Sequence, residues 1–253
     1  MTTLKKILIN IALGFIPSSK KRKELRQKYI NSSVFTELTN IIDGNRLIII
    51  KPDGSISNEN YIQGLNISFI GSNSKVILHE PIQLYNCNIN IKDNCHIEIQ
   101  SSPFGIHNLN IDVKDSSKVT IGKNFACNGC HIENHDEKAQ NITIGNDCLF
   151  SYGITIRPSD GHVIYNKDTM EILNRPMTGI TIGDHVWIGM ETIILKDVNI
   201  PSNTIIGAKS LVNKGFKEEY TIIAGIPAKT IKHNTNWHIN NCDAYKTTFV
   251  ATK

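Results

Sequence analysis

Aliphatic residues recur every six positions through the C-terminal half of the chain. The strictest run lies in 182–212, with its aliphatic positions at Ile182, Ile188, Ile194, Ile200, Ile206 and Val212. A small or β-branched residue stands four positions after each of the first five, at Val186, Thr192, Val198, Thr204 and Ser210. The same register occurs earlier at Ile144, Phe150 and Ile156, and more loosely at Ile121, Ile91, Ile97, Ile70, Val76 and Ile82.

This period excludes the two common secondary-structure patterns. The apolar face of an α-helix recurs every 3.6 residues, and a half-buried strand alternates every two. A period of six instead fits a coil with three short flat sides, each with one aliphatic residue pointing inward. Glycine and asparagine tolerate the turn conformations that the corners need. Because one coil cannot bury its own inward residues, the pattern predicts a stack of coils around a continuous core.

The flanks of the repeat read differently. Residues 20–42 are expected to be helical, and residues 47–51 to form a strand before a turn at Pro52-Asp53-Gly54. The polar tail is expected to cover the last coil or to be partly disordered. We therefore expect an N-terminal segment at 1–30, a helix-and-strand cap at 31–66, a solenoid at 67–232 with an inserted loop at 157–179, and a tail at 233–253.

The composition is that of an ordinary soluble protein. Of 253 residues, 40% are hydrophobic and 20% are charged, and the net charge of +4 gives no indication of a nucleic-acid partner. Six cysteines are too few for a disulfide scaffold, so we expect reduced, mostly buried thiols in a cytoplasmic protein.

The N-terminus is apolar and then basic. Leu4 to Pro17 is too short to span a bilayer, which takes about 20 residues, and no small-residue cleavage site follows it. A run of six basic residues and one acid comes next, between Lys20 and Lys28. This combination fits a helix lying on an anionic membrane surface. An amphipathic helix packed on the domain remains open.

The repeat breaks between Ile156 and Ile180. The inserted segment contains Asp160 and His162, and the repeat resumes in register as Ile-Gly-Asp-His-Val-Trp-Ile-Gly at 182–189. A loop that leaves a rigid scaffold and returns in register is a natural place for functional residues.

The six-residue pattern resembles the hexapeptide repeat of left-handed β-helix acyltransferases. Over residues 140–232 the chain is similar to capsule and lipopolysaccharide O-acetyltransferases, including those of sialic acid, which carry an Asp-x-His loop before the Ile-Gly-Asp-His-Val-Trp-Ile-Gly segment. The resemblance implies an all-β fold, a left-handed parallel β-helix with a short N-terminal helical segment. It also implies a homotrimer whose active sites lie between subunits. The left hand comes from the resemblance alone, because parallel crossovers are otherwise right-handed.

The same resemblance implies transfer of an acetyl group from acetyl-coenzyme A to a hydroxyl of a surface polysaccharide or its sugar precursor. It gives His162 the role of general base, which suits an imidazole at neutral pH. Asp160 would orient that imidazole or bind the sugar, although turn chemistry alone also favours Asp before Gly161. Trp187 is expected to point outward and line the pantetheine and substrate channel, whereas the outward His185 is expected to be structural.

Two further segments, 206–212 and 224–229, resemble the coenzyme A end of these enzymes. Gly207 and Ala208 would let the backbone approach the pantetheine arm, and Gly225 belongs to the second segment. Pro227 would end the last coil. Two lysines, Lys229 and Lys232, would meet the nucleotide phosphates. The chain departs from the family at Ile226, where Asn is usual.

Other interpretations remain open. Cys127, Cys130, His131 and His135 have the composition of a zinc site, but no second pair follows at standard spacing. A β-helical carbonic anhydrase would use His131, His135 and His162, but His131 and His135 are spaced differently from that class and the coenzyme A segment would be unexplained. We therefore expect no metal. N-acetylation of a nucleotide-linked amino sugar is the alternative activity, and a non-enzymatic β-helix scaffold is a third possibility.

Overall fold

The computed structural model describes residues 44–57, 59, 61–134 and 136–246. The helix expected at 20–42 and the membrane-surface segment expected at 1–30 lie outside these residues, as does the end of the tail. In the described ranges, no helix has both the length and the hydropathy that crossing a bilayer would require.

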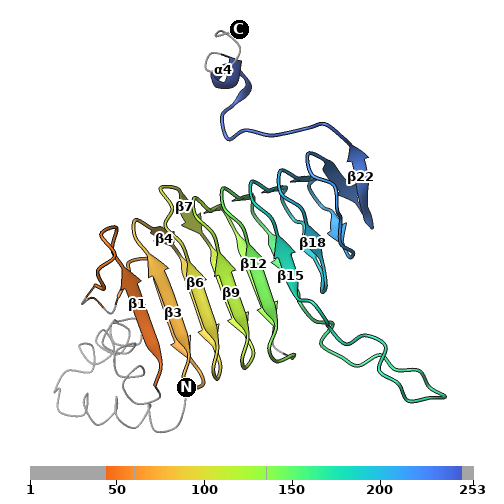
Figure 1. Cartoon of the computed structure of the whole chain (residues 1–253), viewed down its shortest axis with the longest axis horizontal. Coiled ribbons are helices and arrows are strands. Elements are labelled where there is room, and N and C mark those ends of the chain that lie inside the picture. Colours follow the sequence, from red (N-terminus) through yellow and green to blue (C-terminus); the bar gives the residue numbers. More distant parts are fainter. Residues whose placement is uncertain (1–43, 58, 60, 135, 247–253) are drawn as a thin grey trace, which may run out of the picture.

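Three parallel sheets, here called A, B and C, form the sides of a solenoid (Figure 1). Sheet A contains β1 (Arg46–Ile50), β3 (Lys75–His79), β6 (His96–Ile99), β9 (Lys118–Ile121), β12 (Asn141–Ile144), β15 (Ile180–Ile182) and β18 (Asn199–Ile200). Sheet B contains β2 (Leu65–Phe69), β5 (Cys87–Ile91), β8 (Leu109–Val113), β11 (Cys130–Asn134), β14 (Ile154–Ile156), β17 (Ile193–Ile194) and β20 (Leu211–Val212). Sheet C contains β4 (Gln83–Tyr85), β7 (Gly105–His107), β10 (Ala126–Cys127), β13 (Leu149–Phe150), β16 (Trp187–Ile188), β19 (Ile205–Ile206), β21 (Ile222–Gly225) and β22 (Ala228–Lys232).

The two ends of the solenoid differ from its middle. The strand expected at 47–51 is β1, and it pairs with β3, so β1 is the first strand of sheet A among the described residues. At the other end β22 runs antiparallel to β21, which ends the stack of parallel coils. A four-residue helix, α4 (Cys242–Tyr245), follows in the tail.

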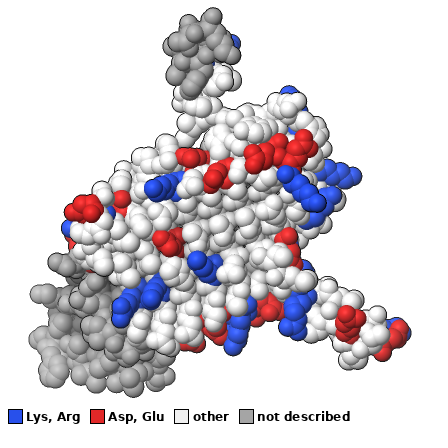
Figure 2. All heavy atoms as spheres, viewed as in Figure 1, with Lys and Arg blue, Asp and Glu red and all other residues white. Residues whose placement is uncertain are grey.

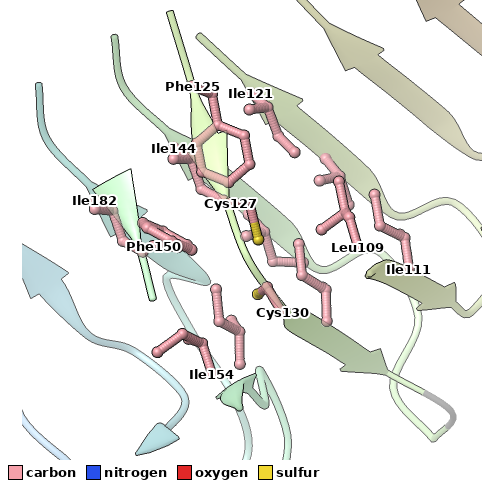
Figure 3. Packing of buried hydrophobic residues seen from close by; sticks show 14 of the residues in the cluster. Leu109, Ile111, Ile121, Phe125, Cys127, Cys130, Ile144, Phe150, Ile154 and Ile182 are labelled. Atoms are coloured by element: carbon pink, nitrogen blue, oxygen red, sulfur yellow. The ribbon is translucent and has the colours of Figure 1, made fainter. Parts of the chain in front are cut away.

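The residues of the six-residue repeat form the core. The six aliphatic residues of the strict run between Ile182 and Val212 are each at most 1% exposed. The small or β-branched residues that stand four positions after the first five of them are each at most 2% exposed. Equivalent residues stack from coil to coil, as in Phe150, Ile188 and Ile206 of sheet C. Large side chains interdigitate between coils, and Phe125 meets Phe150 edge-on with ring centroids 4.9 Å apart (Figure 3). Each fully buried aliphatic side chain of this stack contributes about 1.5–3 kcal/mol.

One repeat position predicted in the N-terminal coils is wrong. Ile70 is 61% exposed, whereas its neighbour Phe69 is 4% exposed and pairs with the inward Ile91. The register of β2 thus lies one residue earlier than the loose repeat indicated. In a strand, a shift of one residue exchanges the inward and outward faces.

The corners of the solenoid require left-handed backbone conformations. At the corner between sheets A and C, successive coils place a residue with φ between 55° and 58° at the same point, as at Asn124, Asp147, His185, Asn203 and Tyr220. Asn and Asp tolerate positive φ better than most residues, which explains the abundance of asparagine in the chain. His185 belongs to this column, in agreement with a structural role.

Candidate active site

The inserted loop forms an arm, residues 157–179, that leaves sheet B after β14 and rejoins sheet A at β15. Tyr165 and Ile172 form an antiparallel bridge within it. The Leu173 amide also donates to the Ile164 carbonyl at 2.8 Å. Figure 1 shows the arm as a narrow hairpin that projects away from the solenoid. The predicted break in the repeat is therefore an ordered element that places its residues beyond the surface of its own coils.

Asp160 lies at the base of the arm and holds it to the solenoid. Its carboxylate pairs with the ammonium of Lys196, from the next coil. It also accepts a hydrogen bond from Asn174 Nδ2 at 2.8 Å. The hydrogen bond from Lys196 lowers the pKa of Asp160, so the carboxylate is held in its charged form.

Asn174 links Asp160 to the backbone around His162. Its Nδ2 also donates to the His162 carbonyl at 2.8 Å, and its Oδ1 accepts from the Ile164 amide at 2.8 Å. Among the described residues, none forms a hydrogen bond with the exposed His162 imidazole. Asp160 thus positions the His162 main chain through Asn174, and the imidazole faces outward toward whatever approaches the arm.

The surface of the arm is strongly apolar. The side chains that are between 41% and 86% exposed include Val163, Ile164, Tyr165, Met170, Ile172, Leu173 and Met177. Monomeric soluble proteins seldom expose a contiguous apolar surface of this kind, and such surfaces typically mark sites of contact with another molecule.

Trp187 points outward, as expected, but on a different side of the solenoid from the arm. It is 38% exposed on sheet C, whereas the arm joins sheets B and A. Its neighbours in register on the outward side of the strands are Leu149, Ile205 and Ile222, of which Ile205 is only 8% exposed, so sheet C carries an apolar column that is partly covered. Within one chain, no contact between described residues joins His162 to Trp187.

The described part of the tail, residues 233–246, runs back along the corner between sheets A and C and not across the end of the last coil (Figure 1). The Thr235 amide donates to the Tyr220 carbonyl at 2.9 Å, and Trp237 Nε1 donates to the His185 carbonyl at 2.9 Å. The Trp237 ring stacks on the His185 ring, with centroids 4.5 Å apart, and lies 6.1 Å from the ring of Trp187. Sequence reasoning missed Trp237, although a tryptophan in a polar tail was a signal.

The predicted coenzyme A segments lie at the C-terminal end of the solenoid. Gly207 has a packing reason to be glycine, because a Cβ there would lie 2.8 Å from the Cβ of Ala224 in the next coil. Ala208 is exposed beside it. Gly225 has φ +108°, which only glycine adopts readily, and it leads into the turn with Pro227 that reverses the chain into β22.

Lys229 lines a surface pocket of about 570 Å³. Lys214 and Lys217 line the same pocket, with Phe216 between them. In Figure 2, Lys and Arg side chains lie beside Asp and Glu side chains at this end of the solenoid, and Glu218 also lines the pocket. Lys232 is exposed at the end of β22 and does not line the pocket. The structure therefore brings Lys229 together with two lysines that sequence reasoning missed.

Of the residues considered for zinc, the two cysteines belong to the core, and His135 lies outside the described residues. Cys127 and Cys130 are 1% and 2% exposed among buried aliphatic residues (Figure 3), and burial raises the pKa of Cys127 to about 12. His131 Nε2 lies 2.7 Å from the Asp112 carboxylate. Within the described residues, no group of three or more His, Cys, Asp and Glu side chains is arranged to hold a metal ion.

Comparison with known proteins identifies relatives over most of the chain. No family model matches. A polysialic acid O-acetyltransferase of Neisseria meningitidis is 29% identical over 210 residues, which cover 82% of this chain and 86% of that protein. A galactoside O-acetyltransferase of Escherichia coli K12 is 32% identical over 118 residues, 46% of this chain and 54% of that protein.

Two solved structures share the fold over a similar range. The polysialic acid-specific acetyltransferase NeuO has a TM-score of 0.69 and 26% identity, covering 83% of this chain and 90% of its own. The polysialic acid O-acetyltransferase OatWY has a TM-score of 0.67 and 27% identity, covering 82% and 94%. The expected all-β, left-handed parallel β-helix is confirmed, and the relatives that the chain matches are hexapeptide-repeat acetyltransferases.

Proposed function

We propose that this protein transfers an acetyl group from acetyl-coenzyme A to a hydroxyl of a surface polysaccharide, of the capsule or lipopolysaccharide, or of its sugar precursor. The observation that carries the proposal is the similarity to a polysialic acid O-acetyltransferase over 82% of the chain. The arm supports it, because it presents an exposed histidine on an ordered base.

His162 is the general base of the proposed reaction. Its imidazole accepts the proton of the acceptor hydroxyl as the hydroxyl oxygen attacks the thioester carbonyl carbon. The tetrahedral intermediate then breaks its carbon–sulfur bond, and the imidazolium returns the proton to the leaving sulfur. The acetyl ester and coenzyme A are the products. Asp160 acts by fixing the arm through Lys196 and Asn174.

The active site is proposed to form between subunits of a homotrimer. The arm and the outward column of sheet C are both apolar, and they lie on different sides of one solenoid. In a closed ring each subunit presents the same two surfaces, so the arm of one subunit meets sheet C of the next. This arrangement would bring His162 of one chain beside Trp187 of its neighbour and bury the apolar residues of the arm.

Acetyl-coenzyme A is proposed to lie along the C-terminal coils. Lys214, Lys217 and Lys229 supply three positive charges against one negative charge, that of Glu218, around one pocket, and this excess of positive charge suits the phosphates of the nucleotide. Gly207 and Ala208 border the path of the pantetheine arm, with Gly225, Pro227 and Lys232 at its end. Trp187 of the neighbouring chain would form the opposite wall.

The location is proposed to be cytoplasmic, with peripheral contact at the inner face of the membrane. This part of the proposal rests on the apolar and basic sequence of residues 1–28, beyond the described part of the chain. Surface polysaccharides are assembled at that face, so the contact would bring the enzyme to its acceptor.

Incubation of the purified protein with acetyl-coenzyme A and a panel of capsular and lipopolysaccharide glycans tests the proposal. Mass spectrometry should show a gain of one acetyl group per modified sugar, and mild alkali should remove it because esters are base-labile. An alkali-stable acetyl group on a nucleotide-linked amino sugar would instead support N-acetylation. Absence of any acetylated glycan, with intact acetyl-coenzyme A, would contradict the proposal.

A further inference from the structure

The C-terminal segment 233–246, here called the strap, creates a cavity on the corner between sheets A and C. The cavity has a volume of about 520 Å³ and is lined by His185 of the corner and by Asn236, Trp237, His238, Asn240, Cys242, Tyr245 and Lys246 of the strap. It lies beside Trp187, whose ring centroid is 6.1 Å from that of Trp237.

The position of Trp237 is fixed from two directions. Its indole nitrogen donates to the His185 carbonyl at 2.9 Å, and its ring stacks on the His185 imidazole with an angle of 15° between the planes. The strap is anchored a second time at Thr235, whose amide donates to Tyr220 of the last coil. The tryptophan is therefore a rigid aromatic surface at the edge of the cavity.

The polar groups that line the cavity are two asparagine amides, the imidazoles of His185 and His238, the Tyr245 hydroxyl, the Cys242 thiol and the Lys246 ammonium. The Asn240 side chain and the Asn236 amide nitrogen form no hydrogen bond with any described residue. Lys246 adds a single positive charge. A flat aromatic ring beside exposed amides suits a sugar, since the ring packs on its C–H face and the amides bind its hydroxyls.

The same lining suits coenzyme A poorly. A nucleotide with several phosphates favours a cluster of cations, and that cluster lies elsewhere, at Lys214, Lys217 and Lys229. The single positive charge of Lys246 matches the single carboxylate that each sugar of an acidic polysaccharide carries. The cavity is thus complementary to an acidic sugar.

We propose that the strap forms a carbohydrate subsite for the acceptor, with Trp237 as its platform and Asn236, Asn240 and Lys246 as its polar contacts. This subsite rests on the proposed function. It holds one sugar of the acceptor near Trp187 while a neighbouring sugar of the same acceptor is acetylated. Trp237 is accordingly a specificity-determining residue for the acceptor, separate from the binding of acetyl-coenzyme A.

The chain contains two tryptophans, Trp187 and Trp237, which makes the subsite directly observable. In a Trp187→Phe variant all tryptophan fluorescence comes from Trp237. Titration of this variant with sialic acid oligomers of defined length, without acetyl-coenzyme A, should shift or quench the emission in a saturable way.

Kinetics of a Trp237→Ala variant separate the two substrates. Loss of an aromatic contact should raise the KM for the oligomer about threefold to tenfold, with the KM for acetyl-coenzyme A unchanged. Trp237→Phe should restore part of the loss because the ring remains. Ile239→Ala is the matched control, since Ile239 lies on the same strap, is 50% exposed and does not line the cavity.

The outcomes distinguish this inference from the proposed function. If the wild-type protein acetylates the oligomers and Trp237→Ala has the same KM for them, the subsite is wrong and the strap is only structural. If Trp237→Ala lowers the melting temperature and leaves the KM for the oligomers unchanged, the strap is likewise only structural. If the wild-type protein acetylates nothing, the proposed function fails, and an unchanged Trp237 emission with oligomers then overturns the subsite as well.

Discussion

Replacement of Asn174 by alanine should impair catalysis without unfolding the protein. Asn174 makes three hydrogen bonds of 2.8 Å at the base of the arm, to Asp160, to the His162 carbonyl and from the Ile164 amide. A hydrogen bond contributes about 0.5–1.5 kcal/mol, and the low value is appropriate at a partly exposed site. Three such bonds give about 1.5 kcal/mol, which is a factor of about ten in the equilibrium constant between the ordered and the open base.

We therefore expect Asn174→Ala to lower kcat/KM by up to about tenfold and to speed hydrogen exchange by about tenfold at the Leu173 amide, which keeps its acceptor, the Ile164 carbonyl. The midpoint of urea unfolding should stay the same, because the arm contributes nothing to the core. Asn166→Ala is the matched control: Asn166 also accepts backbone hydrogen bonds in the arm, from Asp168 and Thr169, but at its far end. If both variants retain wild-type activity and exchange, the arm base does not position His162.

The charge on Asp160 predicts how the arm base responds to pH. Because the hydrogen bond from Lys196 lowers the pKa of Asp160, the charged carboxylate is favoured in the folded state. Its contribution is fully present above the ordinary Asp pKa of about 4, and it is lost as the pH falls through the lower folded-state value. Protection of the Ile164 amide should therefore be independent of pH between about 5 and 8 and decrease in stronger acid, once the intrinsic rate is corrected. If protection of the Ile164 amide instead decreases within the range of about pH 5 to 8, a group other than Asp160 holds the arm.

Three further predictions concern the core, the assembly and the N-terminus. Ile188→Ala should reduce the free energy of unfolding by about 2–5 kcal/mol in urea titrations, whereas Ile193→Ala, at a position 40% exposed, should cost far less, and equal losses would contradict the inward register. Co-assembly of inactive His162→Ala and Trp187→Ala chains should restore part of the activity, and no restoration in verified mixed oligomers would argue against a shared site. Deletion of residues 1–28 should abolish salt-sensitive sedimentation with anionic vesicles while activity on a soluble glycan persists, and equal sedimentation of both proteins would exclude that segment as the membrane contact.

The fold could be predicted because one simple pattern governs it. Each inward position of a solenoid faces the same position of the next coil, so a single period identifies most of the core, as at Ile182 and Ile200. The prediction failed at Ile70, where the repeat is loose and a neighbouring aromatic residue, Phe69, was available for the inward position. A periodicity signal is weakest at the ends of a repeat array, where fewer coils define the register.

The candidate site could be predicted only in part. His162 and Trp187 belong to a contiguous motif, so resemblance identified both. The contacts that support them depend on pairing between coils far apart in sequence: Asp160 meets Lys196, and His185 meets Trp237. Neither pair has a characteristic spacing. The lysine pocket was missed for the same reason, because the turn after β20 and the hairpin strand β22 together form it.

The rate of acetyl transfer by a His162→Ala variant, at saturating acetyl-coenzyme A and glycan, tests the central claim most directly. Its control is His107→Ala, since His107 lies on the N-terminal coils and stacks on Tyr85 with ring centroids 4.4 Å apart. Loss of a general base should lower kcat about 100- to 10,000-fold while coenzyme A binding is retained, and the control should remain at the wild-type rate. A His162→Ala protein with kcat close to that of wild type would contradict the assignment of the base.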